Sequence, residues 1–256
     1  MKTWLSNFSI SGISFTLEDG VLIIRYGERI FDIFSDVAAR NRYIALLDAI
    51  DKDPDVKAVL SLNEHGCLGE EPYEKHITKL SGQNKPANLG ASQHFRDDKK
   101  YARQLCFHYY TIKKRLASKK LIIDGLQGVV VTPFFGESLS ADIRFVSEDC
   151  CFSLTHKKYG LHPIGGLAFF LPRFVGQGRA KEILFTRDVI DAKSALDLGL
   201  VSRIFPNDDF ESNCIQSAKE LTKLSPVTIE TTKELSFHDE EALDDYFQKE
   251  TKWIHW

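Results

Sequence analysis

The sequence predicts an α/β core followed by a helical C-terminal region. Short β-type runs alternate with amphipathic helical patterns from the start of the chain to Pro206. A polar stretch with several glycines and prolines interrupts them between about residues 64 and 96, and both segments after Pro206 have helical apolar spacing. We therefore expect an α/β core over residues 1–206 and a helical region over residues 207–256.

The first elements are a predicted β-hairpin, a helix and a strand. The runs ISFTLE and VLIIRYG flank Asp19-Gly20, a dipeptide that favours a tight hairpin turn. Ser35 is then a typical helix N-cap, and the apolar residues that follow it have helical spacing until Pro54 ends the pattern. The run KAVLSL after Pro54 predicts a buried strand.

The polar stretch between about residues 64 and 96 predicts a long surface excursion, and such loops often carry function. A second helix over KKYARQLCFHYYTIKKRLAS and a strand over KKLIIDGL follow it. Further on, Pro172 in LPRFVG predicts a helix start. DAKSALDLG predicts a short helix that Asp191 caps and Gly199 ends.

The composition excludes several classes of protein. Because 33 basic residues stand against 36 acidic ones, no charge excess predicts a nucleic-acid or anionic-membrane partner. The five cysteines are odd in number and lack CxxC spacing, which favours a reducing cytoplasm. No window approaches the roughly 20 apolar residues of a membrane span, and the first residues lack a signal-peptide pattern. We expect a soluble, cytoplasmic protein.

Several well-known catalytic motifs are absent from the sequence. It contains no Walker loop, no GxGxxG after a strand, no GxSxG elbow and no HExxH. Its histidines and cysteines never adopt the spacing of metal ligands. Phosphate-loop, nicotinamide and zinc chemistry therefore have no support from motifs, and we expect neither a metal nor a cofactor.

From Lys119 to Pro206 the sequence resembles the crotonase superfamily, the enoyl-CoA hydratase/isomerase family. SADIRFVSEDCCFSL is similar to the family segment ACDIRIASEDARFGL, and KKYGLHPIGGLAFFLPRFVG to xxLGLxPGxGGxxxLPRLVG. Upstream, NEHGCLGEEPY resembles the family's GxGxxFxAGxDL through Gly69 and one acid. The resemblance implies a crotonase-like spiral of ββα units, as in the ClpP/crotonase fold. It also implies a CoA thioester as substrate, and C-terminal helices over residues 207–256 that form homotrimers or hexamers.

The resemblance implies an oxyanion hole in which two backbone N–H groups stabilise an enolate oxygen; one such donor can contribute ~3 kcal/mol. One donor falls on Glu70. The other falls on the family's glycine triplet, which here reads Thr132-Pro133-Phe134. Pro133 occupies the central donating position, and proline has no N–H. The second donor would then have to be the Phe134 amide.

Two registers are open for the catalytic side chains. Without gaps, Gly136 falls on the family's first catalytic glutamate and His156 on the second. Ordinary hydration, which uses two carboxylates, is then the least supported reaction, although His156 suits proton transfer through an unperturbed pKa of roughly 6.5. With a shift of one residue, Glu137 falls on the first glutamate. Glu137 can equally serve only to stabilise a helix start by its charge.

Other residues have weaker indications. The resemblance places a set of candidate substrate contacts around the expected acyl pocket, with core packing or a surface position as the alternative for each: Leu68, Gly69, Pro133, Tyr159 and His162. Lys75, Lys79 and Lys85 are candidates for the CoA phosphates, although a solvated face explains them equally well.

Two functions remain open at this point. The first is a crotonase-like acyl-CoA lyase or isomerase that stabilises an enolate with the Glu70 and Phe134 amides, while His156 or Glu137 moves protons. The second is a catalytically impaired acyl-CoA-binding or structural protein of the same fold. Pro133 and the two missing glutamates favour the second, and the varied chemistry of the superfamily favours the first.

Overall fold

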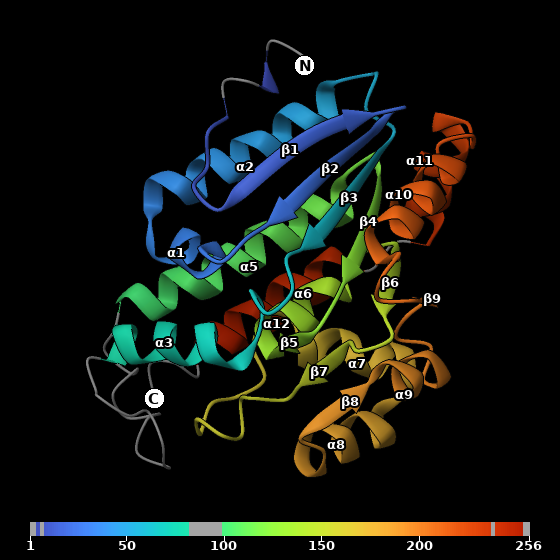
Figure 1. Cartoon of the computed structure of the whole chain (residues 1–256). Coiled ribbons are helices and arrows are strands. Elements are labelled where there is room, and N and C mark those ends of the chain that lie inside the picture. Colours follow the sequence, from blue (N-terminus) through green and yellow to red (C-terminus); the bar gives the residue numbers. More distant parts are fainter. Residues whose placement is uncertain (1–3, 6–7, 82–98, 237–238, 253–256) are drawn as a thin grey trace.

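The structure is a computed structural model that describes residues 4–5, 8–81, 99–236 and 239–252. Its centre holds a six-stranded sheet in the order β1-β2-β3-β4-β6-β9 and a three-stranded sheet in the order β5-β7-β8 (Figure 1). The strands of the large sheet are β1 (Ile13–Glu18), β2 (Val21–Tyr26), β3 (Ala58–Asn63), β4 (Leu121–Leu126), β6 (Ile143–Ser147) and β9 (Arg203–Phe205). Those of the small sheet are β5 (Val129–Val131), β7 (Cys151–Ser153) and β8 (Val189–Asp191).

The predicted hairpin at the start of the chain is confirmed. Asp19 and Gly20 have φ angles of 47° and 83°, the left-handed backbone that a two-residue hairpin turn requires. β1 therefore pairs antiparallel with β2, and Glu18 lies opposite Val21. The remaining neighbours in the large sheet pair in parallel.

Helices cover both faces of the large sheet, so its central strands are buried on both sides. Leu22 and Ile24 of β2 belong to the larger core, which includes residues of α2 (Val37–Lys52) and α5 (Lys99–Ala117). Val21 and Ile23 point the other way and share a smaller core with Phe210 and Cys214 of α10 (Phe210–Leu221).

Three local predictions were wrong. The cap of α2 is Asp36, whose side chain accepts hydrogen bonds from the Ala38 and Ala39 amides; Ser35 ends the preceding helix α1 (Ile30–Ser35). The polar stretch after residue 64 contains α3 (Glu70–Ser81), because buried residues recur there at helical spacing; residues 82–98 lie outside the described residues. Pro172 lies inside α7 (Leu167–Val175), since the buried apolar residues before it start the helix earlier.

The small sheet leads directly into α6 (Thr132–Ser138), which continues from β5. Pro133 lies in its first turn, where the missing N–H costs no helical hydrogen bond, and all seven residues are buried. After α7 come α8 (Gln177–Thr186) and α9 (Ala192–Asp197). The predicted cap of α9 is confirmed, because Asp191 accepts a hydrogen bond from the Ser194 amide.

The chain after residue 206 is helical, as predicted, and its last helix returns to the core. It forms α10, α11 (Pro226–Leu235) and α12 (Glu240–Lys252). Asp244 of α12 pairs with Lys113 of α5 at 2.8 Å, and the Tyr246 ring lies 5.4 Å from that of Phe169 in α7. Across the described ranges, no helix has the length and apolar character needed to cross a bilayer.

Candidate functional site

The start of α3 (Gly69–Glu70) presents the first candidate donor. The amide of a first helical residue has no partner inside its own helix, which applies to Glu70. The backbone around it is held firmly: Gly69 N–H donates to the Gly66 carbonyl at 3.0 Å, and Val131 N–H donates to the Leu68 carbonyl at 3.1 Å. The second bond ties the α3 start to the strand that leads into α6.

The Glu70 side chain is occupied by protein contacts. Ser153 Oγ donates to Glu70 Oε1 at 2.7 Å, and Lys158 Nζ lies 3.1 Å from Oε2. The hydrogen bond from Ser153 lowers the pKa of Glu70, with a further contribution from Lys158, so the carboxylate is ionised at neutral pH. Glu70 also lines an open pocket of about 440 Å³ together with Lys157 and Lys158.

The start of α6 (Thr132–Phe134) is closed by a glycine turn (Gly165–Gly166). A Cβ built on Gly165 would lie 2.3 Å from the Pro133 carbonyl oxygen, and one built on Gly136 would lie 2.5 Å from the Gly165 carbonyl oxygen. These distances leave no room for any side chain at either position. The space that a glutamate at residue 136 would use is therefore filled by the backbone of the glycine turn.

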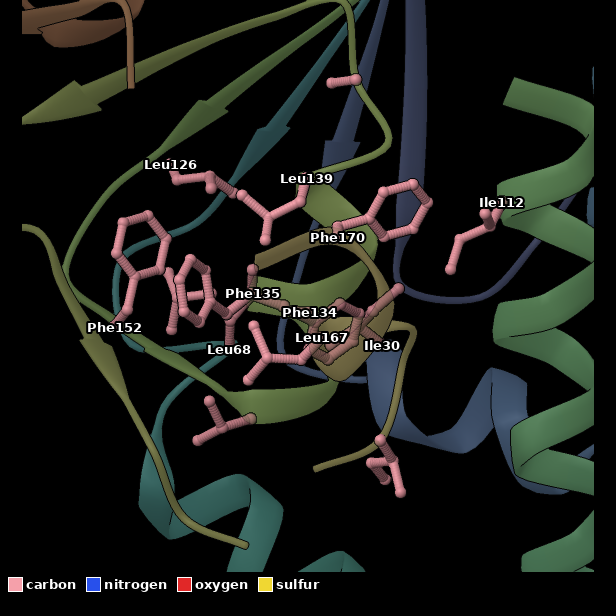
Figure 2. Close-up of a cluster of buried hydrophobic side chains, with 14 of the residues drawn as sticks. Ile30, Leu68, Ile112, Leu126, Phe134, Phe135, Leu139, Phe152, Leu167 and Phe170 are labelled. Atoms are coloured by element: carbon pink, nitrogen blue, oxygen red, sulfur yellow. The ribbon is translucent and has the colours of Figure 1, made fainter. Parts of the chain in front are cut away.

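Phe134 and its neighbours project from α6 into the apolar core. Figure 2 shows Phe134, Phe135 and Leu139 within this cluster of buried side chains. The Phe134 ring makes edge contacts with Phe31 at 5.4 Å and with His108 at 5.8 Å between centroids.

Glu137 points into the interior, where it joins a buried network of charges. His108 Nδ1 lies 2.5 Å from Glu137 Oε2, and Arg115 Nη1 lies 3.6 Å from Glu137 Oε1. Arg115 also donates to Asp124 at 2.5 Å. Burial opposes the charge of Arg115, but Asp124 and Glu137 outweigh it and raise the pKa of the guanidinium. Two polar atoms of the network, Arg115 Nε and Asp124 Oδ1, have no hydrogen-bond partner among the described residues.

An inner cavity of about 30 Å³ adjoins this network. Leu68, from the segment before α3, and Phe134, from the α6 start, both line it. The polar residues at its wall are Tyr26, Tyr43, Ser61, Arg115, Asp124, Glu137 and Ser138. The cavity therefore brings Leu68 and Phe134 into one space with Glu137.

His156 has different neighbours from Glu137. Its Nδ1 lies 3.4 Å from Thr132 Oγ1, and its Nε2 lies 3.3 Å from the Leu184 carbonyl oxygen. Burial lowers the pKa of His156 to about 4, so the imidazole is neutral at neutral pH. The structure thus places His156 against α8 and Glu137 against α5.

Tyr159 and His162 are held by contacts within the protein. The Tyr159 ring packs 5.7 Å from that of Tyr73, and its hydroxyl lies 3.5 Å from Glu74 Oε2. Burial lowers the pKa of His162 to about 4, so its imidazole is neutral at neutral pH.

The candidate lysines lie on the surface next to acidic partners. Lys75 pairs with Glu71 at 2.8 Å and Lys79 with Asp32 at 3.5 Å, while Lys85 lies outside the described residues. Lys75 and Lys79 both line a broad pocket over α3.

A sequence model described as enoyl-CoA hydratase/isomerase matches residues 88–253, well over half of the chain. The chain belongs to this family. A putative enoyl-CoA hydratase of Thermus thermophilus is 28% identical over 190 residues, which cover 74% of this chain and 69% of that protein. A 4-chlorobenzoyl coenzyme A dehalogenase of an Arthrobacter species is 30% identical over 115 residues, but these cover only 44% of this chain and 42% of the dehalogenase.

Solved structures of the enoyl-CoA hydratase/isomerase family share the fold. An enoyl-CoA hydratase of Bacillus halodurans has a TM-score of 0.76 at 16% identity, covering 96% of this chain and 94% of its own. One from Mycobacterium avium subsp. paratuberculosis has a TM-score of 0.73 at 20% identity, covering 96% and 93%. The predicted crotonase-like fold is therefore confirmed, and the low identities mark a divergent member of the family.

Four buried titratable residues were not predicted from the sequence: His108, Arg115, Asp124 and Glu250. His108 and Arg115 are seven residues apart in α5, a spacing that places them on one helix face. Asp124 is the one charged residue of the strand LIIDGL. Both signals were present in the sequence, whereas the position of Glu250 depends on how α12 folds back.

Proposed function

We propose that this enoyl-CoA hydratase/isomerase family member acts on an acyl-CoA thioester through an enolate. The backbone amides of Glu70 and Phe134 are the proposed oxyanion donors, and Glu137 is the proposed acid and base. One observation carries the proposal: Leu68, Phe134 and Glu137 line the same inner cavity. Glu137 of α6 therefore shares one space with Leu68, two residues before the proposed Glu70 donor, and with Phe134, the other proposed donor.

The chemistry follows from this arrangement. Glu137 would take a proton from the carbon next to the thioester carbonyl, and the electron pair would move onto the carbonyl oxygen, where two N–H groups stabilise the charge. His108 and Arg115 hold the Glu137 carboxylate in place. His156 is the second proposed proton carrier, as a neutral base. A cavity of about 30 Å³ has room for roughly two water-sized groups, which favours a short acyl chain.

Relatives and surface features support the remaining parts of this proposal. The Arthrobacter dehalogenase and a dienoyl-CoA isomerase of Arabidopsis thaliana, 24% identical over 199 residues, are both named for CoA thioesters. We propose a CoA thioester as substrate, no additional cofactor, no nucleic-acid or membrane partner, and a cytoplasmic location. Residues 207–256 would form a trimerisation region of a homotrimer or hexamer, which the exposed Val227 and Leu235 favour.

Forming an enolate removes the α-proton of the thioester whatever the final product is. Exchange of this proton with solvent therefore tests the proposal. The protein would be incubated with acetyl-CoA or butyryl-CoA in deuterated water, and deuterium at the α-carbon would be measured by mass spectrometry. We expect exchange with the natural protein and a loss of roughly 100-fold in Glu137→Gln. Glu71→Gln is the matched control, since Glu71 is exposed and its carboxylate pairs with Lys75 on the surface of α3. Equal exchange in Glu137→Gln and the natural protein would remove Glu137 from the mechanism.

The second candidate function is acyl-CoA binding without turnover. The contact of the glycine turn with Pro133 and Gly136 favours it, because that contact fills the position of the family's first catalytic glutamate. Calorimetric binding of butyryl-CoA without any α-proton exchange would select this candidate over the enolate mechanism.

A further inference from the structure

A second cavity, here called the α11 cavity, is lined by residues from the end of α6, the start of β6 and helix α11. Its volume is about 400 Å³, which is within the range of sites that hold small molecules. It has no lining residue in common with the inner cavity at Glu137. Acyl-CoA chemistry at Glu137 therefore gives the α11 cavity no role.

Arg144 brings an unbalanced positive charge to the wall of the α11 cavity. Only 4% of its surface is exposed. Its Nε donates to the Leu200 carbonyl at 2.5 Å, and its Nη1 donates to the carbonyls of Ala141 at 2.7 Å and Ser138 at 3.3 Å. Among the residues that the structure describes, Nη2 has no acceptor and no carboxylate pairs with the guanidinium. Because a cation taken out of water without a counter-charge is costly, an anion is favoured at Nη2.

The other charges at the wall balance each other. Lys233 Nζ lies 2.6 Å from Asp142 Oδ2, which also accepts a hydrogen bond from the Ile122 amide. Within the described part of the chain, Arg144, Lys233 and Asp142 are the only charged residues that line the cavity. One positive charge is therefore in excess, and a ligand with a single negative charge complements it.

The rest of the α11 cavity suits an aliphatic chain. Large apolar side chains line it, among them Leu116, Leu139, Phe174 and Ile229. The Phe174 ring centre lies 4.8 Å from Arg144 Cζ, so apolar surface begins directly next to the charged group. Thr228 and Thr232, one turn apart on α11, add two hydroxyl groups to the lining.

We propose that the α11 cavity is a binding site for an aliphatic monocarboxylate, whose carboxylate accepts from Arg144 Nη2 and whose chain lies against the apolar wall. The carbonyl oxygens that bind Nε and Nη1 hold the guanidinium in one orientation, which pre-arranges Nη2 for the carboxylate. The site is separate from the proposed acyl-CoA site, and its existence does not depend on enolate chemistry.

Calorimetry with octanoate on the full-length protein tests the site, and 1-octanol is the uncharged match for the ligand. We expect octanoate to bind at least about tenfold more tightly than 1-octanol. Thr232→Glu adds a negative charge to the lining and should weaken octanoate binding by about tenfold or more, whereas Thr232→Gln should stay within about threefold. Thr231→Glu is the matched control, because Thr231 is exposed on the same helix but does not line the cavity.

Three results would overturn the site. They are equal affinities for octanoate and 1-octanol, equal losses in Thr232→Glu and Thr231→Glu, and a crystal structure in which the octanoate carboxylate lies beyond hydrogen-bond distance of Arg144. Light scattering tests the other occupant, a second copy of the chain. A change of oligomeric mass in Thr232→Glu, together with no octanoate binding by the natural protein, would assign the cavity to a contact between subunits and overturn the proposal.

Discussion

The starts of α3 and α6 are linked by the bond from Val131 to Leu68, yet they differ in every other respect. At the α3 start the Glu70 side chain is partly exposed and bonds to Ser153 and Lys158. The α6 start is buried, begins with a residue that lacks an N–H, and lies under the glycine turn. The proposed oxyanion hole needs a donor from each start, and at α6 the Phe134 amide would have to take the place of the N–H that Pro133 lacks.

The comparison also shows that the changes at α6 belong together. A glutamate at residue 136 and the present glycine turn exclude each other, because the turn occupies the space of any side chain there. The remaining carboxylate of α6, Glu137, accordingly faces the inner cavity and not the glycine turn.

The largest expected effect is on the free energy of unfolding, to which the buried charges behind α6 should contribute more than the exposed charges at α3. Arg115→Met leaves Asp124 and Glu137 buried without their cation and should lower the free energy of unfolding by ~4 kcal/mol. Lys158→Met removes a half-exposed partner of Glu70 and should cost less than ~1 kcal/mol. Urea denaturation measures both. Similar losses in the two variants would contradict the assigned difference in burial.

The next effect concerns the close packing at α6. Gly136→Ala places a methyl group against the backbone of Gly165 and Leu167, which cannot move without displacing the glycine turn. We expect a loss of ~3 kcal/mol. Gly178→Ala is the matched control, because nothing lies within 4 Å of its added Cβ, and it should stabilise α8 by ~0.5–1 kcal/mol. A tolerated Gly136→Ala in thermal denaturation would mean that the turn is not fixed on α6.

The fold could be predicted from the sequence because its signals are local. The Asp19-Gly20 turn and the Asp191 cap are determined by residues close together in the sequence, and the structure confirmed both predictions. The helix starts predicted from Ser35 and Pro172 were wrong, because buried apolar residues nearby determine where these helices begin. The resemblance of the segment after Lys119 to the enoyl-CoA hydratase/isomerase family then predicted the order of the helices and strands.

The candidate site was less predictable because it depends on long-range contacts. Sequence alignment placed Pro133 and Gly136 in the site, but could not show that Gly165 lies against them. His108 pairs with Glu137 across 29 residues of sequence, and Lys113 pairs with Asp244 of the last helix across 131. No local pattern encodes such pairs, since they arise only when separate elements pack.

A smaller effect tests the missing donor at α6. Pro133→Ala adds an N–H in the first turn of α6, where no helical acceptor competes for it. If the site forms an enolate, α-proton exchange of butyryl-CoA should rise by about tenfold. Glu70→Ala keeps its backbone amide at the α3 start and should leave the same rate within about twofold. A large loss in Glu70→Ala would show that the side chain, and not the amide, acts at α3.

The smallest effect compares two carboxyl groups in different surroundings, Glu250 in the buried part of α12 and Glu70 at the start of α3. Burial raises the pKa of Glu250 to about 8 from 4.5, whereas the bond from Ser153 lowers the pKa of Glu70. Between pH 4.5 and 8 the folded protein keeps a proton on Glu250 that the unfolded chain releases, so Glu250 makes stability fall as the pH rises through this window. From pH 7 to 8 we expect a loss of about 1 kcal/mol in the free energy of unfolding from this group. Urea denaturation at both pH values should show the loss in the natural protein and in Glu70→Gln, but not in Glu250→Gln. An equal loss in Glu250→Gln would assign the pH dependence to another group.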